Sequence, residues 1–276
     1  MRKESRNIQV VMLFCVCTLI SALFTGCAKE KRNEKQEDNL PKIIVGSDNY
    51  PPYNYIDTDG KATGIDVELA TEAFKRMGYQ AEFKMINWEE KKSLLENGKV
   101  DCIWGSFTMN GREADYKWAG PYMVSRQVIA VSKNSDIQSL EDLEDKIIAV
   151  QSTTKPEEIF RKHNDSHIPK VREVISVQNR ELIYTFLSKG YADAVAAHET
   201  AILQYMSDYG LEYRILNEPL ETVGLGVAFD KTDERGLDQK LNIVFQKMRE
   251  DGTAEKIIGQ YLENPERYLE VDAYEK

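Results

Sequence analysis

The feature that most constrains the fold is an alternation of short apolar runs with stretches of helical periodicity along most of the chain. Residues 42–46 (KIIVG), 81–86 and 100–104 have the pattern of buried strands, and apolar residues at helical spacing lie between them. Such alternation is typical of a largely parallel sheet with helices on both faces. A second series of the same kind begins near residue 127. The sequence therefore predicts an α/β protein.

Turn and capping residues bound the expected elements. In the first series we expect helices over residues 65–77 and 88–98. The second series has expected strands at 127–132, 147–151, 171–177, 192–197 and 223–229, and expected helices that begin near residues 139, 156, 181, 199, 237 and 253.

Residues 100–122 contain one of these strands and lead to a candidate ligand-binding residue. Its apolar strand passes into small and hydroxyl residues, then a turn at residues 110–111, then Arg112. A guanidinium offers a planar fork of donors that fits a carboxylate at two points. The alternative is a surface arginine that pairs with Glu113 or Asp115.

Length and charge exclude several classes of function. The 276 residues are enough for one large domain or two modest lobes, and 42% hydrophobic with 30% charged residues indicates a globular protein. A formal net charge of -10 argues against a nucleic-acid partner, which would require a basic face. The three histidines, His163, His167 and His198, are not at ligand spacing, so we expect no metal and no cofactor.

The N-terminus has the layout of a secretory signal peptide. A basic start is followed by residues 8–24, which carry no charge, and then by small residues directly before Cys27. This end resembles the lipobox of bacterial lipoproteins, which predicts a signal over residues 1–27 and lipid on Cys27, with Phe24 where the motif usually has leucine. An uncleaved membrane anchor is the alternative. Both interpretations place the folded part outside the cytoplasm, at the cell membrane.

Residues 28–40 mix both charges without a core-forming pattern and are expected to be a flexible tether. Cys15 and Cys17 lie in the signal, so a lipidated Cys27 leaves only Cys102 for the folded part. A single cysteine cannot form an internal disulfide, and we expect Cys102 to be a buried small apolar residue.

Four motifs, in this order, resemble those of the type 2 extracytoplasmic solute-binding proteins, close to the polar amino-acid branch of ABC importers. They cover most of the chain after residue 41 and are DNYPPY (48–53) followed by GIDVEL (64–69), KVD (99–101) leading to Arg112, VQSTT (150–154), and MREDGT (248–253).

The resemblance implies a periplasmic binding protein type 2 fold, in which two Rossmann-like α/β lobes are joined by two hinge strands with the ligand between them. Lobe 1 would comprise residues 41–126 and 224–276. Lobe 2 would comprise residues 127–223.

The resemblance also implies a site. Arg112 would bind the ligand's α-carboxylate as a bidentate pair, and backbone N–H groups would complete the shell, in part at a helix N-terminus. Thr153 and Thr154 could equally be plain helix caps. The residues expected around the carboxylate besides Arg112 are Gly105, Ser106, Thr108, Thr153 and Thr154.

Aromatic residues are expected around the ligand side chain. Tyr50 matches the family aromatic that stacks on the ligand, and Trp88 begins a helix after a strand. Tyr53 is better explained by core packing. Asp48 could meet a cationic end of the ligand or could cap a turn.

The sequence departs from the family at the ammonium site. An aspartate is usual at the position of His198, and a neutral histidine brings no opposing charge. Glu199 could supply the charge if the backbone is shifted by one residue. This departure bears on whether the ligand is an ordinary L-α-amino acid.

The expected function is binding without catalysis. A monomeric lipoprotein, anchored to the membrane, would capture a small zwitterionic solute, such as an amino acid, and deliver it to an ABC permease. One alternative is a sensor that signals through a separate partner. Another is an enzyme resembling the cyclohexadienyl dehydratases, with His198 and Glu199 beside Arg112 as a source of a general acid.

Overall fold

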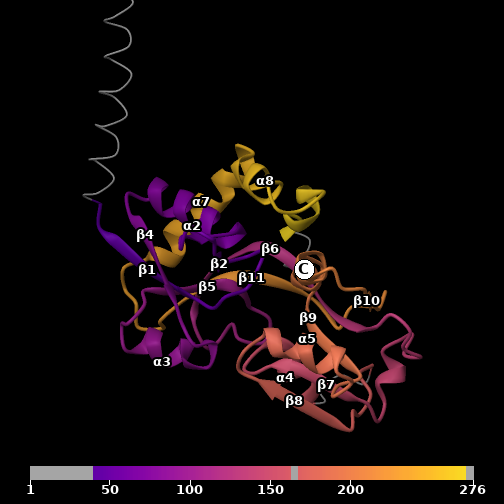
Figure 1. The fold of residues 1–276 in the computed structure, drawn as a ribbon. Helices are drawn as coiled ribbons and strands as arrows, with labels where there is room; N and C mark the ends of the chain where they lie inside the picture. The colour runs from indigo at the N-terminus through magenta and orange to yellow at the C-terminus, as the bar shows by residue number, and fades with distance from the viewer. Residues whose placement is uncertain (1–39, 163–166, 272–276) are drawn as a thin grey trace, which may run out of the picture. The chain divides into compact units, whose positions relative to one another are not determined.

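The computed structural model describes residues 40–162 and 167–271 (Figure 1). The predicted signal peptide, Cys27 and nearly all of the predicted tether lie outside the described residues. Within the described part of the chain, no helix combines the length and the apolar character needed to cross a membrane.

The described strands form one nine-stranded sheet in the order β4-β1-β5-β11-β6-β9-β7-β8, with β10 paired to β6, and a small two-stranded sheet of β2 and β3. Their bounds are β1 Lys42–Ser47, β2 Tyr55–Ile56, β3 Ala62–Thr63, β4 Gln80–Met85, β5 Cys102–Thr108, β6 Lys117–Ser132, β7 Ile147–Gln151, β8 Glu173–Val177, β9 Ala194–His198, β10 Tyr213–Ile215 and β11 Glu221–Phe229.

The direction of the strands corrects one expectation. Strands β1 and β5 are parallel, and β7 is parallel to both β8 and β9. In the middle of the sheet, β11 is antiparallel to β5 and β6, and β6 is antiparallel to β9. The prediction of a largely parallel sheet is therefore wrong for the middle, where β6 is one strand of 16 residues that continues through both series.

Apolar spacing explains the helices, whose inward faces are buried. In α2, buried residues recur from Ile65 to Phe74, acidic residues occupy the first turn and basic residues the last, which suits the helix dipole. The helix expected near residue 139 is only a short 3-10 turn. The helices are α2 Ile65–Arg76, α3 Lys91–Glu96, α4 Lys155–Lys162, α5 Glu181–Ser188, α6 Glu199–Tyr209, α7 Leu237–Glu250 and α8 Thr253–Ile258, with 3-10 turns η1 Trp88–Glu90, η2 Glu141–Leu143 and η3 Pro265–Tyr268.

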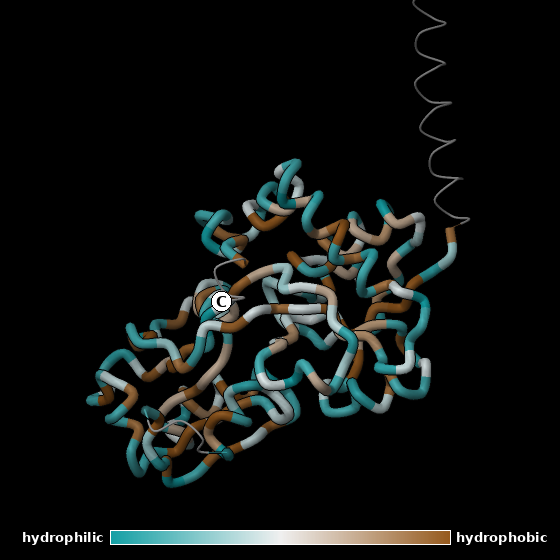
Figure 2. The backbone as a smooth tube through the Cα atoms, turned by 180° about the vertical axis from the view of Figure 1, so that it is seen from behind, coloured by the Kyte–Doolittle hydropathy of each residue, from teal (hydrophilic) through white to brown (hydrophobic). Residues whose placement is uncertain are grey.

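The buried core divides into two lobes, each with an apolar cluster on either face of the sheet. Alternate residues of β6 show this, because Ile129 packs into one cluster and Val128 into the other. In Figure 1, α7 and α8 lie beside α2, so the C-terminal helices return to the N-terminal lobe. Figure 2 shows hydrophobic stretches recurring along the backbone of both lobes between hydrophilic turns. The fold is a two-lobe α/β fold.

A close approach between β11 and the turn after β5 fixes the segment that carries Arg112. The Met109 amide donates to the Gly224 carbonyl at 3.0 Å, and a Cβ on Gly226 would lie 2.5 Å from Met109 Sδ. The Arg112 amide then donates to the Met109 carbonyl at 2.9 Å, which closes the turn. Arg112 is therefore carried on a turn that is anchored to a core strand.

Candidate ligand-binding site

A cavity with an empty volume of about 410 Å³, part of it open to solvent, brings together side chains from both lobes. Its size is within the range of small-molecule sites. Most of the residues expected from the sequence line it, namely Tyr50, Trp88, Gly105, Ser106, Thr108, Arg112, Thr153, Thr154 and His198.

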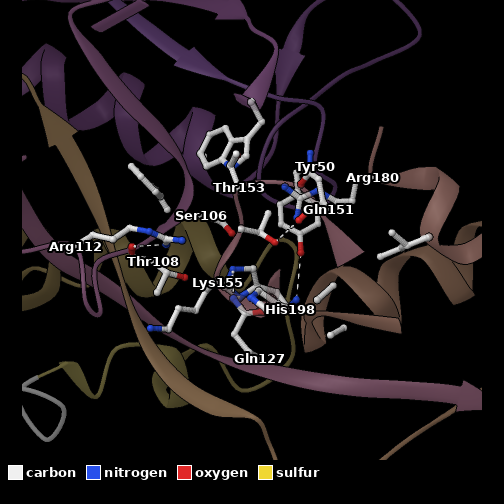
Figure 3. A pocket seen from close by; sticks show the side chains of 18 residues that line it. Tyr50, Ser106, Thr108, Arg112, Gln127, Gln151, Thr153, Lys155, Arg180 and His198 are labelled. Atoms are coloured by element: carbon white, nitrogen blue, oxygen red, sulfur yellow. Dashed lines mark hydrogen bonds between the residues drawn. The ribbon is translucent and has the colours of Figure 1, made fainter. Parts of the chain in front are cut away.

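Arg112 is held from two sides at one end of this cavity. Its Nη1 donates to the Thr108 carbonyl at 3.2 Å (Figure 3). Its Nη2 lies 3.3 Å from Glu158 Oε2 of α4. The side chain is 13% exposed and its guanidinium stands 5.5 Å from the Phe107 ring centroid. The ion pair therefore forms with Glu158 of α4, not with Glu113 or Asp115, and the fork keeps further donors for a ligand.

Strand β5, which leads to the turn that carries Arg112, is held in place by a buried carboxyl group. Asp66, at the start of α2, accepts from the Ser106 amide at 2.6 Å and from the Tyr122 hydroxyl at 2.8 Å. Burial raises the pKa of Asp66 to about 7. Ser106 has a left-handed φ of 49°, and its buried Oγ has no partner among the described residues. That hydroxyl is available to a ligand.

The turn before α4 differs from the expectation that its backbone N–H groups are free to bind a ligand carboxylate. The Thr153 amide already donates to Glu157 Oε2 at 2.6 Å, and Thr154 Oγ1 donates to the Gln151 carbonyl at 2.6 Å. Both threonines line the cavity, but these two groups are engaged within the protein.

Lys91 is a buried cation that the sequence analysis did not identify. Its ammonium donates to Thr153 Oγ1 at 2.8 Å and to the Trp88 carbonyl at 3.1 Å, and it lies 4.9 Å from the Trp88 ring centroid. Burial, with the nearby charge of Arg112, lowers the pKa of Lys91 to about 7. Lys91 thus connects the lobe of β5 to the turn that precedes α4.

The opposite end of the cavity is formed by Arg180, which precedes α5 and was also not identified from the sequence (Figure 3). Its guanidinium carbon lies 3.1 Å from the Tyr50 ring centroid, and its Nη2 lies 3.1 Å from Asp48 Oδ2. Gln151 Nε2 also donates to Asp48 Oδ2, at 2.9 Å. Asp48 is therefore engaged behind this wall and is not itself a lining residue.

His198 ends β9 inside the cavity as a neutral ring. Its Nδ1 lies 2.8 Å from Ser125 Oγ, and the Gln127 amide lies 3.0 Å from its Nε2. Burial, with the nearby charge of Arg180, lowers the pKa of His198 to about 3. Its own amide donates to the Tyr50 hydroxyl at 3.2 Å.

Glu199 is not among the cavity-lining residues. It starts α6 and forms an ion pair with Arg126 at 2.8 Å. Glu199 thus lies outside the cavity that His198 lines. Of the two residues that the dehydratase alternative offered as a source of a general acid, only His198 lines the cavity with Arg112.

Two expectations about buried residues are confirmed. Tyr53 is fully buried in the core, where its hydroxyl lies 2.6 Å from Thr200 Oγ1. Cys102 is a free, fully buried thiol in β5, and burial raises its pKa.

Several lining residues carried only weak signals in the sequence. Gln151 ends an expected strand, where parallel strands commonly present ligand-binding groups. Arg180 resembles an ordinary surface charge at a helix start, and so does Lys91, which contacts lining residues without lining the cavity itself. Only contact between distant segments buries these two side chains. The polar and charged lining residues that the sequence analysis missed are Gln127, Gln151, Lys155 and Arg180.

Comparisons with known proteins agree with this arrangement. The model of the bacterial extracellular solute-binding proteins, family 3, matches residues 43–264. The histidine-binding periplasmic protein of Escherichia coli is 30% identical over 231 residues, which cover 80% of this chain and 87% of that protein. The L-cystine-binding protein TcyA of Bacillus subtilis is 27% identical over 261 residues, which cover 90% of this chain and 94% of that protein.

A solved structure, that of an ancestral arginine-binding protein bound to arginine, has a TM-score of 0.72 at 28% identity, and the match covers 80% of this chain and 98% of that one. Fold and cavity together define an extracytoplasmic solute-binding protein of type 2, with its relatives in the polar amino-acid branch. The chain belongs to the bacterial extracellular solute-binding proteins, family 3.

Proposed function

We propose that this protein is the substrate-binding component of an ABC importer and captures a small zwitterionic solute, such as an amino acid, between its lobes. The observation that carries the proposal is the Arg112 guanidinium, which is held at a cavity wall by Thr108 and Glu158. A fixed fork with unused donors binds a carboxylate with little loss of side-chain entropy.

The neutral groups of the cavity suit the rest of a zwitterion. Gln127 Oε1 and Gln151 Oε1 are buried without partners among the described residues, and an ammonium group can donate to an amide oxygen. His198 is neutral, so it contributes no opposing charge. Ammonium binding by neutral oxygens is therefore part of the proposal, in place of binding by Glu199.

Closure would follow the boundaries predicted from the sequence, with residues 41–126 and 224–276 as lobe 1 and residues 127–223 as lobe 2. Strands β6 and β11 pair from Glu221 opposite Gln127 to Phe229 opposite Lys117, and they connect the two parts. A hinge in these strands would let the lobes close on a solute.

A permease lies in the membrane, and a lipid anchor would keep the binding protein close to it. We propose that the signal over residues 1–27 is removed and that Cys27 carries the lipid of a monomeric lipoprotein on the outer face of the cell membrane. Metabolic labelling with a palmitate analogue tests this, because Cys27→Ser should remove the label and a label that survives would refute the anchor.

A thermal-shift scan of the purified protein against amino acids and related small carboxylates tests the function. A ligand that binds only the folded state raises the apparent stability by mass action. We expect one class of solute to raise the melting temperature of the wild type and to have no such effect on Arg112→Ala. A shift of equal size in Arg112→Ala would exclude the carboxylate role of Arg112, and no shift from any of these solutes would refute the proposed function.

A further inference from the structure

The cavity carries positive charge at both ends and no acidic lining residue. Among the described residues that line it, Arg112, Lys155 and Arg180 are cationic, and none is an aspartate or glutamate. The acids nearby are already paired behind these cations, as Glu158 is with Arg112 and Asp48 is with Arg180. A cationic group at the far end of a solute, next to Arg180, would therefore meet like charge.

Arg180 occupies a place at this cavity where an aromatic face and a carboxylate meet. Its guanidinium carbon lies 3.1 Å from the Tyr50 ring centroid, and its Nη2 lies 3.1 Å from Asp48 Oδ2. Stacking on an aromatic ring together with a carboxylate partner is the arrangement by which proteins bind guanidinium and ammonium groups. Here the protein's own side chain makes both contacts.

The burial of the Arg180 side chain and its unpaired Nε donor indicate that the guanidinium is part of the binding site. Its side chain is 10% exposed, and the buried Nε has no partner among the described residues. An unpaired buried donor is costly unless an acceptor reaches it. A solute with an acceptor at its far end would supply that partner.

Arg180 also separates two spaces. Together with Tyr50, it lines both the cavity described above and a second cavity with an empty volume of about 400 Å³, bordered by Glu181 and Asp208. The guanidinium therefore limits the length of a solute that extends away from Arg112, and Figure 3 shows the two arginines on opposite sides of the group of lining side chains.

We propose that Arg180 determines specificity by filling, with its own guanidinium, the position between Tyr50 and Asp48 that a cationic side chain would take. The site then rejects arginine and lysine and selects solutes whose far end is an acceptor, as in a carboxamide or a carboxylate. This inference rests on the proposed function, since it assigns the far end of a solute whose carboxylate is on Arg112.

Calorimetric titration of the purified full chain with L-arginine, L-lysine, L-glutamine and L-glutamate tests the inference. The wild type should bind L-glutamine or L-glutamate, and a large excess of L-arginine should not displace either. Arg180→Ala should bind L-arginine at least 10-fold more tightly than the wild type does. The matched variant Arg180→Lys keeps the positive charge and should still reject it.

The double variant Arg180→Ala with Asp48→Asn should lose the affinity for L-arginine that Arg180→Ala gains. This loss would show that the gained affinity depends on the Asp48 carboxylate and does not come only from the volume freed by the shorter side chain. Tight binding of L-arginine by the wild type would overturn the inference and leave the proposed function standing. The same holds if Arg180→Ala folds, still binds the wild-type solute, and gains nothing for L-arginine. Failure of the wild type to bind any of these solutes or other small carboxylates would overturn both.

Discussion

At the scale of single residues, Arg112 is positioned by the protein before any solute arrives. Thr108 and Glu158 hold it from opposite sides, and the turn beneath it is bonded to β11. The guanidinium therefore presents a fork of fixed direction, and its shape should matter as much as its charge.

We predict that Arg112→Lys weakens solute binding nearly as much as Arg112→Ala does, by about 2 kcal/mol or more, because a lysine cannot form the two-point pair. Calorimetric titration of the solute identified by the thermal-shift scan measures both variants. Arg126→Lys is the matched control, since Arg126 pairs with Glu199 away from the lining residues. An Arg112→Lys protein with wild-type affinity would mean that charge alone is used.

Lys91 should make the free energy of unfolding depend on pH, and the sign of this dependence follows from its pKa. Burial lowers its pKa in the folded state to about 7, whereas the unfolded chain holds that proton up to about pH 10. The unfolded state then binds more protons between these values, so this group makes the free energy of unfolding rise as the pH increases from 7 to about 10.

Urea denaturation at pH 7.5 and 9.5 measures this contribution. Lys91→Met should reduce the rise in stability between the two pH values, relative to the wild type. Lys92→Met, at the exposed neighbouring position, should leave the rise unchanged. Equal rises in the wild type and Lys91→Met would contradict the burial of the ammonium.

Sequence reasoning identified the residues of the site that belong to local motifs. Arg112 follows a strand and a turn, and Trp88 follows a strand, so short-range patterns predicted both. Lys91 and Arg180 could not be predicted in this way, because the segments that bury them, around Thr153 and around Tyr50, are distant in the sequence. For Asp48, the local pattern placed it in the right loop, but its engagement by Arg180 depends on the other lobe.

At the scale of elements, the start of α2 fixes the loop that carries Tyr50. The Ile65 amide donates to the Pro52 carbonyl at 3.0 Å, and the Asp66 amide donates to the Tyr53 carbonyl at 2.8 Å. Gly64 precedes the helix at a φ of +118°, and a Cβ there would lie 2.4 Å from the Tyr53 carbonyl oxygen. The loop and the helix can approach this closely only with glycine between them.

We predict that Gly64→Ala lowers the free energy of unfolding by more than about 2 kcal/mol, since it combines an unfavourable φ with a backbone clash. Gly60→Ala is the matched control. It has a positive φ of +78° with nothing within 4 Å of the added Cβ, and it should cost only about 1 kcal/mol. Chemical denaturation compares them, and equal losses would show that the contact with Tyr53 is unimportant.

Most elements were predictable because their signals are local. Helix α2 has its apolar spacing, and strand β7 has a continuous apolar run. The length of β6 was not predicted, since Gly120 and Pro121 interrupt the pattern, and only pairing with β11 makes the strand continuous across them. The antiparallel middle of the sheet likewise depends on partners far along the chain.

At the scale of the whole described molecule, contacts between the lobes flank the cavity. Glu89 beside α3 accepts from Ser152 Oγ at 2.5 Å and from Gln178 Nε2 at 3.0 Å. These bonds join η1 to the segments after β7 and β8. They should favour the arrangement in which the cavity is lined from both sides.

We predict that Glu89→Ala weakens the apparent affinity for the solute by about 3- to 10-fold, because a smaller fraction of the protein is then closed. Glu90→Ala, at an exposed neighbouring position, should bind like the wild type. Calorimetry gives the affinities. An unchanged affinity in Glu89→Ala would mean that these contacts do not contribute to closure.

The most direct test of carboxylate capture is a crystal structure of the protein with the solute found by the thermal-shift scan. We predict a carboxylate within hydrogen-bond distance of both a nitrogen of the Arg112 fork and the Ser106 hydroxyl, with residues of both lobes in contact with the solute. A solute bound elsewhere, or bound here with its carboxylate away from Arg112, would contradict the central claim.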